Sequence, residues 1–108
     1  MVTMEGFQSV GPVEDIPPGR SKVVTINNRA IALFNVEGQY FAIYNICPHE
    51  GGPLNEGRVK GFVVSCPWHD LAFDIRNGQG TDGGGYCVGS YEVRVMDGEI
   101  FVGPRRKT

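Results

Sequence analysis

The chain has 108 residues, a formal net charge of −2, and 41% hydrophobic and 20% charged residues. This size fits one domain with a small core, and the composition is that of a soluble globular protein. The sequence contains no indication of nucleic-acid binding, and no apolar run approaches the roughly 20 residues of a membrane span. The segment from Met1 to Glu5 has no basic flank and no apolar export signal, so we expect a cytoplasmic protein.

Short strands separated by tight turns are predicted for the first half of the chain. The 16 glycines are about twice the usual share of roughly 7%, so the chain turns often. Asn27-Asn28 can adopt the positive φ angles of a tight hairpin turn, and Glu37-Gly38 is a second turn. Apolar and β-branched residues between the turns predict four strands, at residues 7–10, 22–26, 29–36 and 39–45.

The second half of the chain follows the same pattern. Four further strands are predicted, at residues 62–65, 72–75, 91–95 and 99–102. Asp97-Gly98 is a strong hairpin signal, and Glu56-Gly57 to Gly61 is expected to be a turn that begins the return. The glycine-rich stretch 78–90 is not a phosphate-binding loop because no helix follows it. No helix is predicted, so the expected fold class is all-β.

Two short motifs, Cys47-Pro48-His49 and Cys66-Pro67-Trp68-His69, each pair one thiol with one imidazole. Together they contain both histidines and two of the three cysteines, which leaves no disulfide framework. The spacer between His49 and Cys66 is long enough for a hairpin that brings one loop back beside the other. Two loops that each offer one sulfur and one nitrogen predict a four-ligand metal site.

Two metals are compatible with this set of ligands. Zinc accepts Cys and His in a tetrahedral site, but zinc modules usually pair two cysteines or two histidines within one motif, whereas each loop here mixes the two types. A [2Fe–2S] cluster has two distinct irons, so one iron can take both sulfurs and the other both nitrogens. Two neutral imidazoles in place of two thiolates also make the cluster easier to reduce.

These motifs resemble the signature of the Rieske iron–sulfur family. That signature is C-x-H, a spacer of about this length, and then C-x-x-H, which Cys47, His49, Cys66 and His69 match one for one. The flanking residues that also agree are Pro48, Gly51-Gly52-Pro53-Leu54, Pro67 and Phe73-Asp74. The resemblance implies one [2Fe–2S] cluster per chain, with Cys47 and Cys66 on one iron and His49 and His69 on the other.

The resemblance also implies the Rieske fold, in which antiparallel sheets form a sandwich or barrel-like arrangement with a two-loop cluster-binding subdomain. Residues 1–108 are then a single Rieske domain, with the cluster-binding part at about residues 45–75. Leu54 resembles the family's apolar plug beneath the cluster; considered alone, it is an ordinary core leucine. The family's third loop often contains proline and packs against the cluster. The matching stretch here has glycines instead, so we expect this cover to be more mobile or placed differently.

Three further positions allow two interpretations each. Cys87 is favoured as a buried small hydrophobe, with an exposed thiol as the alternative. Trp68 belongs to the apolar rim that the two loops would form, so it either contacts a partner or packs against the loop. Arg105-Arg106-Lys107 is expected to be a solvated terminus, with a docking patch as the alternative.

The sequence offers little for bond-making chemistry, because both histidines are used as ligands and no nucleophile–base pair or dinucleotide fingerprint is present. The resemblance to small Rieske ferredoxins implies a soluble one-electron carrier, not an enzyme. A flavin reductase would be its donor, and an oxygenase or other oxidoreductase its acceptor. One alternative is a small Rieske-like subunit of a reductase such as nitrite reductase; another, of a different class, is a zinc-stabilised binding module without a redox role. A catalytic Rieske oxygenase is disfavoured because 108 residues leave no room for a mononuclear-iron domain.

The chain differs in two ways from the respiratory-complex type of the family. That type has an extra cysteine in each loop, and the two form a disulfide; Gly52 and Trp68 stand at those places here. Asp70 and Leu71 follow His69 and supply no hydroxyl for the hydrogen bond that a serine makes to a cluster sulfide in that type. Fewer hydrogen bonds stabilise the reduced cluster less, so we expect a potential of about −150 mV rather than about +300 mV.

Overall fold

The computed structural model describes residues 5–49, 51–68, 71–81 and 85–106. Within these ranges the chain forms nine β-strands and two short 3-10 helices. In chain order the elements are β1 (Gln8–Pro12), η1 (Val13–Asp15), β2 (Ser21–Ile26), β3 (Arg29–Val36), β4 (Gln39–Tyr44), η2 (Leu54–Glu56), β5 (Arg58–Lys60), β6 (Val63–Ser65), β7 (Ala72–Asp74), β8 (Ser90–Met96) and β9 (Glu99–Arg105). The described part of the chain contains no α-helix, and the predicted all-β class is confirmed.

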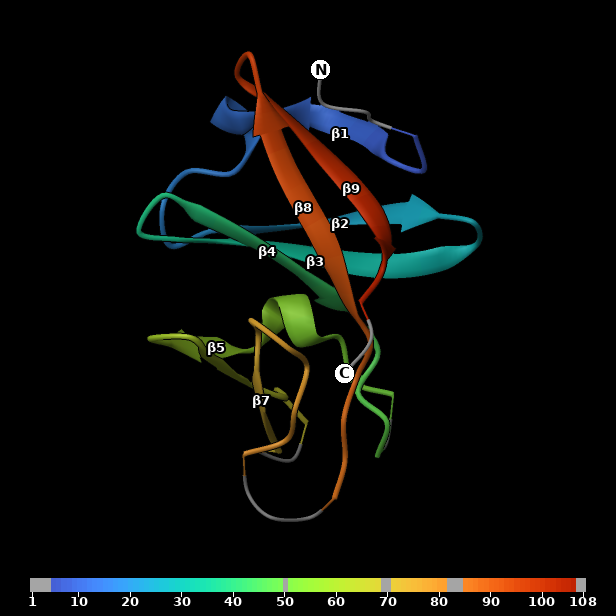
Figure 1. Cartoon of the computed structure of the whole chain (residues 1–108). Coiled ribbons are helices and arrows are strands. Elements are labelled where there is room, and N and C mark those ends of the chain that lie inside the picture. Colours follow the sequence, from blue (N-terminus) through green and yellow to red (C-terminus); the bar gives the residue numbers. More distant parts are fainter. Residues whose placement is uncertain (1–4, 50, 69–70, 82–84, 107–108) are drawn as a thin grey trace.

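Six strands form the upper part of the molecule (Figure 1). Their order is β1-β9-β8-β4-β3-β2, and every neighbouring pair is antiparallel. Lys22 of β2 bridges the two edge strands, because its Nζ atom donates to the Val10 carbonyl of β1 at 3.1 Å and to the Asp15 carboxylate at 3.0 Å. The sheet therefore curls until its edges approach each other, which is the barrel-like arrangement expected from the sequence.

The β2–β3–β4 meander forms at the turns that the sequence predicts. Asn27 and Asn28 have φ angles of 51° and 65°, which asparagine tolerates better than most residues with a side chain. β3 then pairs with β4 along its length, and β4 ends at Tyr44, three residues before Cys47. The meander therefore fixes where the first predicted ligand loop begins.

β3 is buried on both faces because it separates two hydrophobic cores. Successive side chains of a strand point to opposite faces, so Ile31 and Leu33 face one core, and Ala32 and Phe34 face the other. The first, here called the framework core, comprises Ile16, Ile31, Leu33, Ala42, Ile100 and Val102. The second, here called the cluster-end core, comprises Ala32, Phe34, Ile43, Cys47, Leu54, Val64, Cys66, Phe73, Ile75 and Val88. Both predicted cysteine ligands thus lie in the second core.

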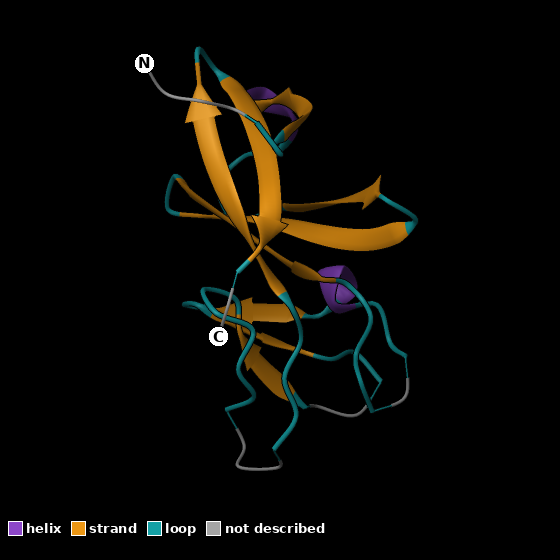
Figure 2. Cartoon of the chain, turned by 45° about the vertical axis from the view of Figure 1, so that its right-hand side comes forward, coloured by secondary structure: helices purple, strands orange, loops and turns teal. Residues whose placement is uncertain are grey.

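A smaller antiparallel sheet, ordered β5-β6-β7, lies below the first together with the connecting loops (Figure 2). Val64 of β6 pairs with Phe73 of β7, and both side chains are fully buried in the cluster-end core. β5 corrects the turn that was expected over residues 56–61. All three of its residues are exposed, so no buried face marks it, and its pairing with β6 alone defines it as a strand.

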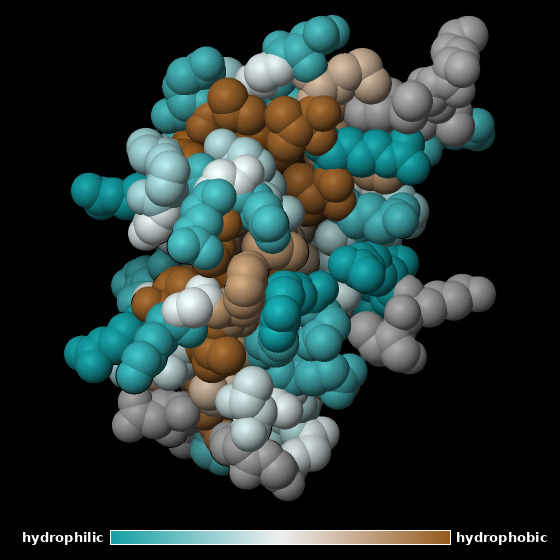
Figure 3. All heavy atoms as spheres, turned by 60° about the vertical axis from the view of Figure 1, so that its left-hand side comes forward, coloured by the Kyte–Doolittle hydropathy of each residue, from teal (hydrophilic) through white to brown (hydrophobic). Residues whose placement is uncertain are grey.

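The face of the molecule seen in Figure 3 carries its largest group of apolar side chains near the top, and polar side chains separate the smaller groups below. Among the described side chains, Trp68 is the most exposed large hydrophobic residue, at 60%. None of the helices in the described residues is long and apolar enough to cross a membrane.

Candidate metal centre

The first ligand loop leaves β4 and closes on itself through backbone hydrogen bonds. The Cys47 N–H donates to the Gly52 carbonyl at 2.9 Å, and the Gly51 N–H donates to the Cys47 carbonyl at 2.9 Å. Below them, the Leu54 N–H donates to the Asn45 carbonyl at 2.7 Å. Cys47 is therefore held at the base of a tight loop that emerges directly from the framework.

A buried asparagine fastens this loop to η2. The Asn45 side chain is 5% exposed, and its Oδ1 atom accepts a hydrogen bond from the Asn55 N–H at 2.7 Å. Leu54, the first residue of η2, is fully buried beside Cys47 and Cys66 in the cluster-end core. This agrees with an apolar plug beneath the two sulfurs.

The second ligand loop connects β6 to β7. These strands pair from Val63↔Asp74 to Ser65↔Ala72, so Cys66 follows directly on the last paired residue. The Cys66 N–H donates to the Leu71 carbonyl at 2.7 Å and closes the base of the loop. The predicted ligand His69, with its neighbour Asp70, lies outside the described residues.

The two loops touch at Gly52. A Cβ atom built on Gly52 would lie 2.6 Å from the Cys66 sulfur and 3.1 Å from the Trp68 ring, which is closer than such atoms can approach. The missing side chain at position 52 thus leaves room for the sulfur of the other loop. Since Gly52 also accepts the hydrogen bond from Cys47, both predicted cysteine ligands border the same small region.

Burial divides the three described ligand candidates into two types. Cys47 and Cys66 are 1% and 0% exposed, whereas His49 is exposed. Within the described residues no three Cys, His, Asp or Glu side chains already form a group that could hold a metal ion, and His69 is not among them. The donors nevertheless fit a [2Fe–2S] cluster, because two buried sulfurs on touching loops suit one iron and an exposed imidazole suits the other.

The glycine-rich segment extends the small sheet and runs along β7. The Asp74 N–H donates to the Gln79 carbonyl at 2.8 Å, and the Gly80 N–H donates to the Tyr86 carbonyl at 2.9 Å. A Cβ atom on Gly78, which has φ +79°, would lie 2.0 Å from the Val88 carbonyl oxygen, so only glycine permits this approach. The sequence analysis expects this segment to be a more mobile or differently placed cover of the cluster. In its described part, the segment is hydrogen-bonded to β7 and within itself.

This segment places Tyr86 against the first ligand loop. The Tyr86 and His49 rings meet edge to face, with centroids 5.7 Å apart and planes at 84°. Tyr86 is not among the residues that the sequence analysis singles out, because the contact joins segments 37 positions apart and no local pattern marks it. The tyrosine holds one side of a predicted ligand ring.

Two residues near the loops differ in how well the sequence predicts them. Cys87 is exposed, so the favoured interpretation of a buried hydrophobe is wrong and the alternative is correct. The Trp68 ring lies over Gly52 and is still 60% exposed, so it packs against the loop and also presents apolar surface to solvent.

An ion pair stabilises the exit from the second loop. The Arg76 guanidinium donates from Nε to Asp74 Oδ1 at 3.0 Å and from Nη2 to Oδ2 at 2.8 Å, and it lies 4.5 Å from the centre of the Phe62 ring. These hydrogen bonds, opposed only partly by desolvation, hold the pKa of Asp74 below its usual value. The pKa of Arg76 is raised for the same reason.

The backbone of the basic C-terminal segment is hydrogen-bonded to the fold up to Arg106. β9 extends to Arg105, and the Arg106 N–H donates to the Ser90 carbonyl at 2.7 Å. The Arg106 side chain reaches the Arg76 carbonyl at 3.3 Å. Arg105 and Arg106 are nevertheless exposed, in agreement with the expected solvated terminus. Lys107 lies outside the described residues.

Known proteins are similar to this chain in both sequence and fold. The 3-phenylpropionate/cinnamic acid dioxygenase ferredoxin subunit of Escherichia coli (strain K12) is 33% identical over 97 residues, covering 84% of this chain and 87% of that protein. A solved complex of reduced oxygenase and oxidized ferredoxin in carbazole 1,9a-dioxygenase contains a chain with a TM-score of 0.86 and 28% identity, covering 95% of this chain and 97% of that one. The candidate small subunit of an NADH-dependent nitrite reductase from Mycobacterium tuberculosis has a TM-score of 0.83 and 26% identity, covering 94% and 96%.

The family comparison agrees with the geometry of the two loops. The sequence model described as "Rieske [2Fe-2S] domain" matches residues 6–87, which include both ligand loops and most of the glycine-rich segment 78–90. The chain therefore belongs to the Rieske [2Fe–2S] domain family, and a [2Fe–2S] cluster is its cofactor.

Proposed function

We propose that this chain is a soluble one-electron carrier whose cluster is bound by Cys47 and Cys66 at one iron and by His49 and His69 at the other. The observation that supports this most is the contact between the ligand loops at Gly52, next to both buried sulfurs. Two buried sulfurs on one side and an exposed imidazole on the other form the arrangement that such a cluster needs.

When bound, the cluster takes up and releases one electron, at a potential raised by its two neutral histidine ligands. The protein residues around it have two roles, which are to exclude water and to provide a route for the electron. The cluster-end core keeps water from the sulfur side, because Leu54, Cys47 and Cys66 are all fully buried there. His49, which is exposed and braced by Tyr86, is the proposed route by which the electron reaches the surface.

The exposed tip of the loops is the proposed docking face. Pro48 and His49 of the first loop and Pro67 and Trp68 of the second are all exposed. An apolar rim around the electron exit suits a weak and transient contact, in which partners must separate after each transfer. Glu50 and Asp70, which are close to these residues in the sequence, lie outside the described residues.

The proposed partners are a flavin reductase as donor and an oxygenase as acceptor, all in the cytoplasm. The support comes from relatives, since the Escherichia coli protein is named a ferredoxin subunit of a dioxygenase and the carbazole structure is a ferredoxin–oxygenase complex. Each relative covers most of this chain, and residues 1–108 are proposed to be a single Rieske domain.

The test is reconstitution of the electron path. The purified chain is combined with NADH and with the flavin reductase and oxygenase encoded by neighbouring genes, and substrate-dependent oxygen uptake is measured. We expect uptake only when the chain is present, and loss of uptake for Trp68→Ala without loss of the visible cluster spectrum. Unchanged uptake without the chain would contradict the carrier role, and unchanged reduction rates for Trp68→Ala would remove its docking role.

A second candidate is a small subunit of a nitrite reductase, which the similarity to the Mycobacterium tuberculosis structure favours. The same purified chain distinguishes the two functions. Stable co-purification with a large reductase subunit, with nitrite-dependent NADH oxidation, would replace the carrier proposal. A zinc-stabilised binding module is disfavoured because the chain belongs to a [2Fe–2S] family.

A further inference from the structure

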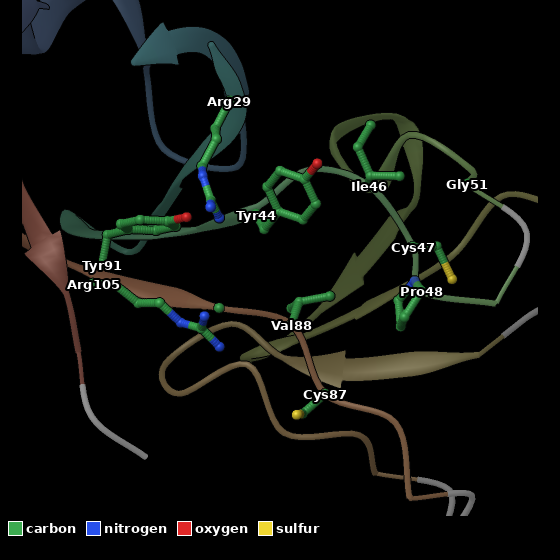
Figure 4. A pocket seen from close by; sticks show the side chains of 11 residues that line it. Arg29, Tyr44, Ile46, Cys47, Pro48, Gly51, Cys87, Val88, Tyr91 and Arg105 are labelled. Carbon is green, nitrogen blue, oxygen red and sulfur yellow. The ribbon is translucent and has the colours of Figure 1, made fainter. Parts of the chain in front are cut away.

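A pocket of about 450 Å³ opens beside the first ligand loop (Figure 4). Its walls come from segments far apart in the sequence: the start of β3, the loop around Cys47 and Pro48, residues 87–91, and the end of β9. The pocket therefore connects the framework sheet to the edge of the proposed metal centre.

The polar side chains that line this pocket are two arginines and two tyrosines. Figure 4 shows the Arg29 guanidinium reaching in between Tyr44 and Tyr91, with Arg105 entering from the end of β9. No acidic residue lines the pocket. Within the described part of the chain, neither arginine side chain has an ion-pair or hydrogen-bond partner, and the same holds for the two tyrosine hydroxyls.

The same group borders a second hollow. Arg29, Tyr91 and Arg105 also line a neighbouring depression of about 380 Å³, which likewise has no acidic residue in its lining. The two guanidinium groups thus stand together at an open surface of a chain whose net charge is −2. Because both guanidinium groups line the same two hollows, an anion bound there would be attracted by both positive charges.

The chemistry of this lining favours a carboxylate. An arginine fork matches the two oxygens of a carboxylate with parallel N–H bonds, and a tyrosine hydroxyl can donate a further bond. Val88 and the Pro48 ring supply apolar walls that would contact the methylene groups of an acidic side chain. Asp and Glu side chains have both a charged carboxylate and a short apolar stem.

We propose that this pocket receives an Asp or Glu side chain from the surface of the redox partner. This inference rests on the proposed carrier function. The pocket shares Cys47, Pro48 and Gly51 with the first ligand loop, so an acidic side chain seated in it would hold the partner against that loop. It would act as a charged anchor beside the apolar contact of Trp68, and it would fix the orientation of the partner.

The test measures binding of a carboxylate probe to the holo protein. A fluorescein-labelled acetyl-Glu-Glu-Glu-amide peptide is titrated with the protein at low ionic strength and followed by fluorescence anisotropy; the matched probe is acetyl-Gln-Gln-Gln-amide. We expect saturable binding of the glutamate peptide only, weakened about threefold by either Arg29→Gln or Arg105→Gln and more by the double variant. Arg29→Lys keeps the charge, so it should retain part of the affinity.

The matched control is Arg20→Gln, which removes the same charge from an arginine outside this pocket. Equal weakening by Arg20→Gln would overturn the proposal, because it would show a general charge effect. Equal binding of the glutamine peptide would overturn it too. Tighter binding of inorganic phosphate than of the glutamate peptide would also overturn the proposal, because it would identify the pocket as a site for a free anion.

A second readout separates this inference from the carrier function. The reduced cluster is strongly paramagnetic, so bound peptide protons should broaden much more in the reduced holo protein than in the same protein when oxidised. Anisotropy without broadening would place the probe elsewhere and overturn the proposal. If the protein carries no cluster, the carrier function fails while the anisotropy still reports on the pocket. If the cluster is present and no probe binds, the pocket proposal alone fails.

Discussion

The two hydrophobic cores of this molecule differ in what completes them. The framework core lies inside the six-stranded sheet and consists of aliphatic side chains such as Ile31 and Leu33. The cluster-end core has a similar aliphatic and aromatic part but also includes Cys47 and Cys66, beside strands of only three residues. Side chains alone complete the first core, whereas the second has two thiols whose proposed partner is iron.

The framework core supplies most of the stability of the fold, and the cluster-end core carries the function. Long paired strands can tolerate the absence of a cofactor, because their backbone hydrogen bonds and packing are internal. Short strands and loops gain much of their stability from whatever binds the ligands. β3 contributes side chains to both cores, so the cluster-end core is built directly on the framework sheet.

The largest effect should follow from removing one of the sulfurs. For Cys66→Ser we expect loss of the cluster and opening of the cluster end, with amide hydrogen exchange at residues 63–65 and 72–74 at least about tenfold faster. Exchange at residues 31–36 should change far less. Iron content and exchange mass spectrometry check this, and Cys87→Ser, which removes an exposed thiol, is the control. Uniform acceleration across both cores would contradict the division.

A cavity in the framework core should lower the stability of the whole protein and leave the cluster spectrum unchanged. Leu33 is fully buried, so Leu33→Ala should cost about 3 kcal/mol in the free energy of unfolding. Val23→Ala, on an exposed position of β2, should cost less than about 0.5 kcal/mol. Urea unfolding followed by circular dichroism provides the values. An altered cluster spectrum in Leu33→Ala would show that the two cores are not separable.

Crowding the contact between the loops should affect the cluster more than the fold. In Gly52→Ala the new methyl group would lie 2.6 Å from the Cys66 sulfur, so we expect iron occupancy to fall to less than about half. Gly19→Ala is the control: φ is +83° there, with no atom near the new methyl group, so it costs about 1 kcal/mol through the backbone alone. Full iron occupancy in Gly52→Ala would mean that the loops can separate without cost.

The smallest effect concerns the Asp74–Arg76 pair next to β7. Asp74→Asn should cost about 1 kcal/mol at pH 7, because the carboxylate accepts hydrogen bonds from Arg76 at a partly exposed site. The pKa of Asp74 lies below 3.8 in the folded state, so this contribution is complete above pH 3.8 and is lost as the pH falls through the lower folded value. Melting temperatures of both proteins should therefore converge in acid. A gap that widens toward low pH would contradict this.

The framework could be predicted from sequence because its signals are local. β3 begins and ends at the predicted residues 29 and 36, since the turns at Asn27-Asn28 and Glu37-Gly38 mark both ends. β5 was missed because its residues are exposed and only its pairing with β6 defines it. The identity of the four ligands follows from a spacing pattern, and it stays a prediction for all of them.

The rest of the site depends on contacts between distant segments, which no local pattern reports. Residues from different loops or strands come together where Gly52 approaches Cys66, where Tyr86 packs on His49, and where Arg29 and Arg105 line one pocket. Cys87 was misjudged for the same reason. The burial of Cys87 depends on which distant segments pack against it, and the structure leaves its thiol exposed.

The most direct test of the central claim is an electron paramagnetic resonance titration of the purified protein with dithionite. We predict a rhombic signal whose average g value lies clearly below that of all-cysteine clusters, appearing with a midpoint near about −150 mV. That result would establish the cluster, its histidine ligation and its low potential together. A colourless, silent sample that contains zinc, or a signal of the all-cysteine type, would contradict the claim that Cys47, His49, Cys66 and His69 hold a Rieske cluster.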